Sequence, residues 1–128
     1  MPRRRIRKLN KFINKLRSKL KRNIEPDDIN YNQMQALIRN GAILIDVRSP
    51  QEYKEGHISG AICIPEYNIQ REIKTKIPNI EQQIIVYCDI GGRSKTAQRK
   101  LKRMGYKEVY NLYQGITQIN DLPNTIMQ

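Results

Sequence analysis

Apolar positions follow two different spacings along residues 29–120. Within residues 31–41, Met34, Leu37 and Ile38 recur at the spacing of a helix, and Gly41 is suited to ending it. Elsewhere the apolar residues form continuous short runs, as in a strand that is covered on both faces. The pattern predicts strands over residues 42–47, 60–65, 83–88 and 108–112. It predicts further helices over residues 49–56, 66–73 and 94–104, and a last helical turn over residues 115–120.

The segment 49–56 carries signals for both ends of a short helix. Ser49 suits the N-cap position and Pro50 the first helical position. Glu52 completes a capping box with Ser49, and Gly56 is placed to stop the helix.

Short apolar strands that alternate with amphipathic helices predict an α/β fold with a small parallel sheet flanked by helices. In such sheets, ligands bind just beyond the carboxyl ends of the strands. Cys88 ends the third predicted strand. The sequence therefore places Cys88 where a functional site is expected.

The first 23 residues have a separate pattern and a separate charge. An apolar residue recurs every three or four positions, at Ile6, Leu9, Ile13, Leu16 and Leu20, and Phe12 widens the apolar face. These residues include eleven Lys or Arg and no acid, whereas the remaining 105 residues carry thirteen basic and twelve acidic side chains. We expect a cationic amphipathic helix over residues 1–23, a boundary near residues 23–28, and a nearly neutral domain over residues 24–128.

Several partners suit such an extension. A basic amphipathic helix binds an anionic membrane surface, and this reading is slightly favoured for residues 1–23. Contact with a protein or with RNA phosphates fits the same residues. A solvated tail without a fixed partner and a targeting peptide also stay open.

Length and cysteine content narrow the protein class. The chain of 128 residues has room for one domain with a single core. Cys63 and Cys88 are its two cysteines and His57 its one histidine, too few for a structural zinc site or a disulfide framework. No apolar run approaches the roughly 20 residues needed to cross a bilayer. We expect a cytoplasmic protein that needs no metal. If residues 1–23 bind an anionic membrane surface, the protein is expected to lie at the inner face of the membrane.

Residues 88–94 read C-D-I-G-G-R-S, and they combine a nucleophile with a turn. Gly91 and Gly92 permit a tight turn that points backbone amides inward, and the following helix N-terminus adds a positive partial charge. Together with Arg93, this arrangement favours a thiolate at Cys88. The alternative is that Cys88 is a small buried apolar residue, and the loop alone leaves the two interpretations about equal.

Three segments together resemble the rhodanese family. They are LIDVRSPQEYKEGHISGAICIP, IVYCDIGGRS and GYKEVYNLYQGI with Gly115, and they occur in order over roughly 90 residues. The resemblance implies a single-domain sulfurtransferase that moves a sulfane sulfur from thiosulfate or a persulfide to a thiol or cyanide through a Cys88 persulfide. It implies no metal and no organic cofactor. A binding or redox-sensing module without turnover is the alternative.

The same resemblance assigns roles around the loop. Cys88 is the nucleophile, and the amides of Asp89, Ile90, Gly91, Gly92, Arg93 and Ser94 hold the outer sulfur. Arg93 closes the loop and is a candidate to attract an anionic donor. Asp46, Arg48 and Glu52 are expected to support the site, and His57 and Cys63 to serve the fold. Tyr106, Tyr110 and Tyr113 are expected to pack in the core and at the surface.

Two further features bear on the substrate. Four residues separate Cys88 from Arg93, whereas related cysteine phosphatases have five, so phosphatase and arsenate reductase activities are disfavoured. Asp89 stands where relatives often have a basic or polar residue. Because a carboxylate opposes capture of an anion, thiosulfate is a doubtful donor, and a protein or small-molecule persulfide is preferred.

Overall fold

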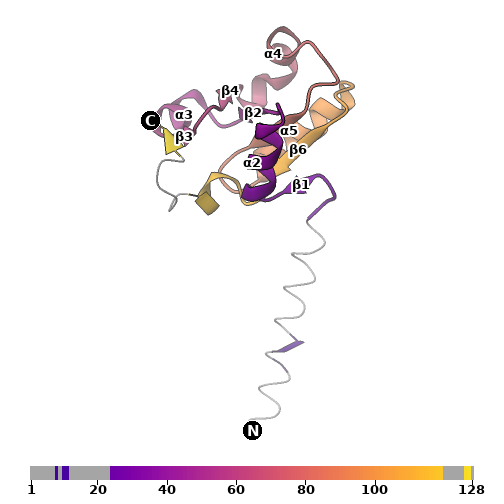
Figure 1. Cartoon of the computed structure of the whole chain (residues 1–128). Coiled ribbons are helices and arrows are strands. Elements are labelled where there is room, and N and C mark those ends of the chain that lie inside the picture. The colour runs from indigo at the N-terminus through magenta and orange to yellow at the C-terminus, as the bar shows by residue number, and fades with distance from the viewer. Residues whose placement is uncertain (1–7, 9, 12–23, 120–125, 128) are drawn as a thin grey trace.

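The computed structural model describes residues 8, 10, 11, 24–119, 126 and 127. Short strands and helices alternate along the chain (Figure 1). In chain order they are β1 (Asp28–Ile29), α2 (Tyr31–Arg39), β2 (Ile43–Asp46), α3 (Pro50–Glu55), β3 (His57–Ile58), β4 (Ile62–Cys63), the 3-10 helix η1 (Glu66–Asn68), α4 (Ile69–Lys76), β5 (Ile84–Tyr87), α5 (Gly92–Arg103), β6 (Val109–Leu112), the 3-10 helix η2 (Gly115–Ile119) and β7 (Ile126–Met127).

Five strands form one parallel sheet in the order β1-β6-β5-β2-β4. β5 is central: it pairs with β2 along its whole length and with β6 from Ile84 to Val86, and its four residues are fully buried. β3 and β7 form a separate antiparallel pair. The predicted α/β fold with a small parallel sheet flanked by helices is confirmed.

The alternation of side chains along β5 divides the core between the two faces of the sheet. Ile84, Val86 and Cys88 pack in a cluster with apolar residues of α4 and α5. Ile85 and Tyr87 pack in a second cluster that includes Met34 of α2. Because successive strand residues point to opposite faces, Cys88 belongs to the face that α5 covers.

The capping signals of the sequence are confirmed in α3. The Ser49 side chain accepts a hydrogen bond from the Glu52 amide, and the Glu52 side chain accepts one from the Ser49 amide. Pro50 occupies the first turn and Gly56 the C-cap. Capping of this kind stabilises a helix by about 1 kcal/mol, which matters for a helix as short as α3.

Three predicted elements have different bounds in the structure. The strand expected over residues 60–65 is reduced to Ile62–Cys63. The helix expected over residues 66–73 begins as η1 and runs on in α4 to Lys76. The helix expected from residue 94 begins at Gly92, because Gly91 turns the chain in the left-handed region at φ 106° and serves as its N-cap.

The sequence pattern missed three of the four two-residue strands of the described residues, namely β1, β3 and β7. β1 follows Pro26 and Asp27 and is too short to show a strand period, yet it extends the sheet beside β6. Such strands form through pairing with a neighbour and not through their own propensity.

The predicted amphipathic helix over residues 1–23 lies outside the described residues, apart from Lys8, Asn10 and Lys11. Its contacts with a membrane surface, a protein or RNA stay predictions. Within the described part of the chain, every helix is too short or too polar to span a bilayer.

The backbone of η2 is hydrogen-bonded to Cys88 and Asp89, the two residues that follow β5. The Ile116 amide donates to the Cys88 carbonyl at 2.9 Å, and the Thr117 amide donates to the Asp89 carbonyl at 3.3 Å. Gly115 has φ 58°, and a Cβ atom there would lie 2.2 Å from the Cys88 carbonyl oxygen. The absence of a side chain at position 115 therefore lets these two segments approach.

Gly115→Ala should destabilise the fold more than a left-handed conformation alone explains. A left-handed alanine costs about 1 kcal/mol, and the clash with backbone adds about 1–3 kcal/mol, so the free energy of unfolding in urea should fall by about 2–4 kcal/mol. Gly60→Ala is the matched control, because Gly60 has φ 85° and open space around it. It should lose only about 1 kcal/mol. Equal losses in the two variants would contradict the close approach at Gly115.

Candidate active site

Cys88 lies just beyond the carboxyl end of β5, at the start of the short loop that leads into α5. Its Sγ atom accepts hydrogen bonds from the amides of Gly91, at 3.2 Å, and Ser94, at 3.4 Å. The thiol can donate to the Ser94 hydroxyl at 3.4 Å, and that hydroxyl donates to the Gly91 carbonyl. The loop therefore places two amide donors and a hydroxyl around one sulfur atom, at the N-terminus of a twelve-residue helix.

The sulfur has a route to the surface although Cys88 itself is only 2% exposed. A pocket of about 490 Å³ is lined by Cys88, Asp89, Ile90, Gly92 and Arg93. Ile90 is 77% exposed and stands at the tip of the loop. Cys88 is thus partly packed in the core, as an apolar residue would be, and also lines an open pocket.

Asp46 and Arg48 form a buried ion pair below the loop. Arg48 Nη2 lies 2.7 Å from the Asp46 carboxylate, and Arg48 Nε and the Arg48 amide also donate to it. Tyr87 donates its hydroxyl hydrogen to the same carboxylate at 2.8 Å and accepts a bond from the Ile58 amide. Arg48 also donates to the Gly56 carbonyl at 2.6 Å, which ties β2 to the end of α3.

Electrostatics fix the charge states in this buried cluster. Burial alone would lower the pKa of Arg48, but the hydrogen bonds and charge of Asp46 outweigh it and raise that pKa. Burial, reinforced by the Asp46 charge, raises the pKa of Tyr87 well above its ordinary value. Arg48 is therefore a cation and Tyr87 a neutral hydrogen-bond donor at neutral pH.

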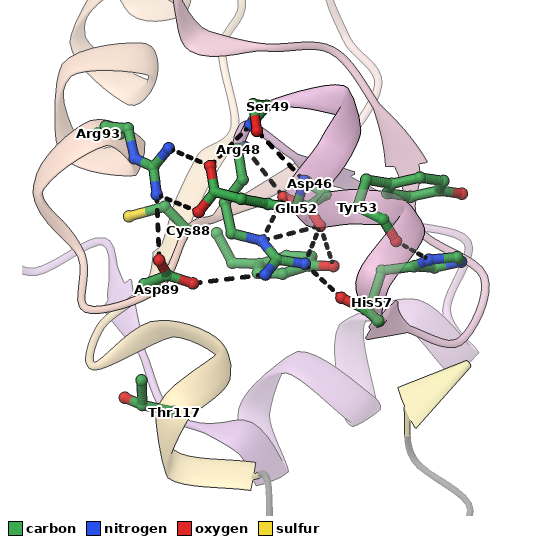
Figure 2. A network of polar contacts seen from close by, with 12 residues as sticks. Asp46, Arg48, Ser49, Glu52, Tyr53, His57, Cys88, Asp89, Arg93 and Thr117 are labelled. Carbon is green, nitrogen blue, oxygen red and sulfur yellow. Dashed lines mark hydrogen bonds and ion pairs between the residues drawn. The ribbon is translucent and has the colours of Figure 1, made fainter. Parts of the chain in front are cut away.

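The two arginines near Cys88 are joined by carboxylates in one chain of contacts, which Figure 2 shows. Arg93 binds both Glu52 oxygens, at 2.7 and 2.9 Å, and contacts Asp89 at 3.2 Å. Asp89 also lies 3.4 Å from Arg48. The chain Asp46–Arg48–Asp89–Arg93–Glu52 contains three carboxylates and two guanidinium groups, so it bears one net negative charge.

Glu52 has two tasks in this network. It caps α3 through Ser49, and it holds Arg93 of α5 across the mouth of the site. The hydrogen bond from Arg93 lowers the pKa of Glu52, and the same bond raises the pKa of Arg93. Arg93, expected to be available to an anionic donor, is already paired with Glu52 and Asp89.

His57 and Cys63 lie outside the arrangement around Cys88. The His57 ring stacks on Tyr53 with centroids 3.6 Å apart, and its Nδ1 atom lies 2.8 Å from the Tyr53 carbonyl oxygen. Cys63 is half-buried with its Sγ 3.8 Å from the Arg48 carbonyl, and burial raises the pKa of its thiol. In the described part of the chain, His, Cys, Asp and Glu side chains form no group of three suited to a metal ion.

Sequence reasoning missed the part that Tyr87 plays. The strand predicted over residues 83–88 gives Tyr87 no role of its own, yet its hydroxyl joins Asp46 of β2 to the β3 backbone. The available signal was its position opposite Asp46 in neighbouring strands, at the end where Cys88 leaves the sheet.

Comparison with known proteins shows which family the chain resembles. The family model described as "Rhodanese-like domain" matches residues 30–122. The thiosulfate sulfurtransferase PspE of Escherichia coli is 40% identical over 67 residues, which are 52% of this chain and 64% of PspE, slightly under two thirds of its length. The thiosulfate sulfurtransferase GlpE of Ectopseudomonas mendocina is 34% identical over 84 residues, 66% of this chain and 75% of GlpE.

Solved structures agree in fold. The Bacillus anthracis protein CoADR-RHD superposes with a TM-score of 0.70 at 31% identity, covering 80% of this chain and 18% of that protein. The human single-domain sulfurtransferase TSTD1 superposes with a TM-score of 0.67 at 22% identity, covering 76% of this chain and 98% of the human chain. Because the family model matches residues 30–122, which are most of the chain, this chain belongs to the rhodanese-like domain family.

Proposed function

We propose that this chain is a sulfurtransferase that carries a sulfane sulfur as a persulfide on Cys88. The observation that carries the proposal is the pair of amide hydrogen bonds from Gly91 and Ser94 to Sγ. Charge-assisted hydrogen bonds of this kind stabilise an anionic sulfur by about 1.5–3 kcal/mol each. The names of the PspE and GlpE relatives support the same reaction class.

In the first step, the Cys88 thiolate attacks the outer sulfur of the donor. A Cys88 sulfur–sulfur bond forms while the donor's sulfur–sulfur bond breaks, and the electron pair leaves with sulfite or with the donor's thiolate. Ser94 suits this change of charge, because its hydroxyl can turn from the Gly91 carbonyl toward the anionic sulfur. The amides of residues 89–94 then hold the outer sulfur in the Cys88 pocket.

In the second step, an acceptor removes that sulfur. A nucleophile such as a thiolate or cyanide attacks the outer sulfur, the persulfide bond breaks, and Cys88 leaves as a thiolate. The cycle needs no metal or organic cofactor, because the persulfide itself carries the sulfur. In this cycle the loop stabilises an anionic sulfur at Cys88 before and after each transfer.

The paired arginines bear on the choice of donor. Glu52 and Asp89 engage Arg93, and Asp46 and Asp89 engage Arg48, so both cations are already neutralised. Thiosulfate carries two negative charges and approaches a network with net negative charge. We infer that a protein or small-molecule persulfide is a better donor for this chain than thiosulfate.

Mass spectrometry after incubation with thiosulfate or another sulfane sulfur donor tests the persulfide. The wild-type chain and Cys63→Ser should each gain one sulfur atom, and Cys88→Ser should gain none. Cys63→Ser is the matched control because Cys63 lies outside the Cys88 pocket. If neither of the two proteins that retain Cys88 gains sulfur from any donor, the alternative of a binding or redox-sensing module without turnover is favoured.

Asp89→Asn tests the donor preference. Removing one negative charge beside a dianionic donor is worth on the order of 1 kcal/mol near water, so kcat/KM for thiosulfate should rise about fivefold. Glu81→Gln removes the same charge at the opposite end of β5, where Glu81 pairs with Lys107, and should leave kcat/KM unchanged. An unchanged or lower kcat/KM in Asp89→Asn would reject the preference.

Glu52→Gln tests the support of the loop through acid unfolding. Because Arg93 holds the pKa of folded Glu52 below its ordinary 4.5, the unfolded chain binds the proton more readily. This stabilisation is present above about pH 4.5 and is lost as the pH falls further. Glu52→Gln should therefore be less stable at neutral pH but lose stability less steeply in acid.

Glu55→Gln is the control for the acid series, because Glu55 lies on the same helix and accepts a bond from Gln51 instead of an arginine. Denaturant titrations at stepped pH values measure both variants. Parallel curves for wild type and Glu52→Gln below pH 4.5 would show that the Glu52–Arg93 contact does not support the fold.

A further inference from the structure

A second pocket, of about 590 Å³, lies on the other flank of the catalytic loop. We call it the β1–α5 pocket. Its walls are Glu25, Asp28, Ile90, Gly91, Gly92, Lys95, Arg99, Asn111, Tyr113 and Gln114. Its volume is in the range of small-molecule sites, and Ile90, Gly91 and Gly92 belong to the loop that surrounds Cys88.

A buried polar cluster forms one wall of this pocket. The Asp28 carboxylate accepts hydrogen bonds from Lys95 Nζ at 2.5 Å and from Asn111 Nδ2 at 3.1 Å. Burial pushes the pKa of Asp28 up, but the bond from Lys95 and the other donors outweigh it and lower that pKa. Asp28 is therefore a carboxylate, which can only accept hydrogen bonds.

The cluster leaves one acceptor without a partner. Because Asp28 accepts only, the amide nitrogen of Asn111 must face it, and this fixes the Oδ1 atom on the other side. Asn111 is 3% exposed, and among the described residues its Oδ1 has no hydrogen-bond partner. A buried acceptor without a partner is unfavourable, and its partial negative charge favours a ligand cation on the Asn111 side of the pocket.

The pocket also has a charged pair that is only loosely held. Glu25 lies 3.4 Å from Arg99 and 3.4 Å from Lys95, and the Glu25 and Arg99 side chains are 48% and 59% exposed. Surface pairs of this kind contribute little, so each group can turn to a ligand. Two acids, Glu25 and Asp28, are balanced by two bases, Lys95 and Arg99. The pocket therefore suits a zwitterion better than a pure anion or a pure cation.

The pocket is in contact with the catalytic sulfur through the loop itself. The Gly91 amide donates to Cys88 Sγ, and Gly91 forms part of the wall. The pocket that Cys88 lines shares Ile90 and Gly92 with the β1–α5 pocket. A ligand in the second pocket therefore lies against the same loop residues, Ile90 and Gly92, that line the pocket of Cys88.

We propose that the β1–α5 pocket binds the amino-acid head group of a small thiol acceptor, such as cysteine or a short cysteine peptide. This inference rests on the proposed function. The ligand ammonium binds the Glu25 carboxylate and the ligand carboxylate binds Arg99. The thiolate then attacks the outer sulfur of protonated Cys88 persulfide, the sulfur–sulfur bond breaks, Cys88 leaves as a thiolate, and the acceptor departs as a persulfide.

Binding is tested without turnover by titrating the full chain with S-methylcysteine, which has the head group but no free thiol. Amide NMR signals of Ile90 and Gly91 should shift and saturate. Arg99→Gln should weaken this binding at least fivefold, and so should Glu25→Gln. Arg103→Gln, which removes the same charge from the same helix outside the pocket, should bind as wild type does. Absence of saturable shifts, or equal affinity in Arg99→Gln, overturns the inference.

Kinetics add a second readout. The ratio of the KM for cysteine to the KM for cyanide should rise at least fivefold in Arg99→Gln and stay constant in Arg103→Gln. A constant ratio in both variants counts against the acceptor site. If Cys88 gains no sulfur at all, the proposed function fails, and the titration with S-methylcysteine still decides whether the pocket binds the head group.

Discussion

The carboxylate of Asp46, fully buried at the end of β2, organises the active-site end of the sheet. It binds Arg48 through the guanidinium and the backbone amide, and it accepts the Tyr87 hydroxyl from the neighbouring strand. Removing one partner from such a buried pair is expensive, because the other charge is left without compensation. Arg48 extends the arrangement to Gly56 and Asp89, so β2, α3 and the start of the Cys88 loop are held by one group.

Around Cys88, two electrostatic influences act in opposite directions. The amides of Gly91 and Ser94 contact Sγ directly and stabilise an anion without adding net charge. The chain from Asp46 to Glu52 brings one net negative charge nearby, but its outer members are exposed and screened by solvent. The short-range amides therefore decide whether the sulfur can be an anion, while the longer-range charge acts on the donor that approaches.

The sequence predicted what depends on local pattern and left out what depends on pairing across the sheet. The α3 cap, the buried β5 strand and the position of Cys88 follow from neighbouring residues, and the structure shows each of them. The bonds of Tyr87 to Asp46 and of Asn111 to Asp28 join residues 41 and 83 positions apart. Their polar atoms gain a role only through the register of neighbouring strands, which no local period reveals.

The same register explains why the loop after β5 borders two pockets. β1 pairs with β6 in a register that sets Asp28 opposite Asn111, and α5 brings Lys95 to the same Asp28 carboxylate. The loop between β5 and α5 consequently has Cys88 and Arg93 on one flank and a buried polar cluster on the other. A transfer enzyme gains from this separation, because the donor and the acceptor can be selected by different charges while both reach the same sulfur. We infer that the fold itself, through the two-residue strand β1, provides the second flank.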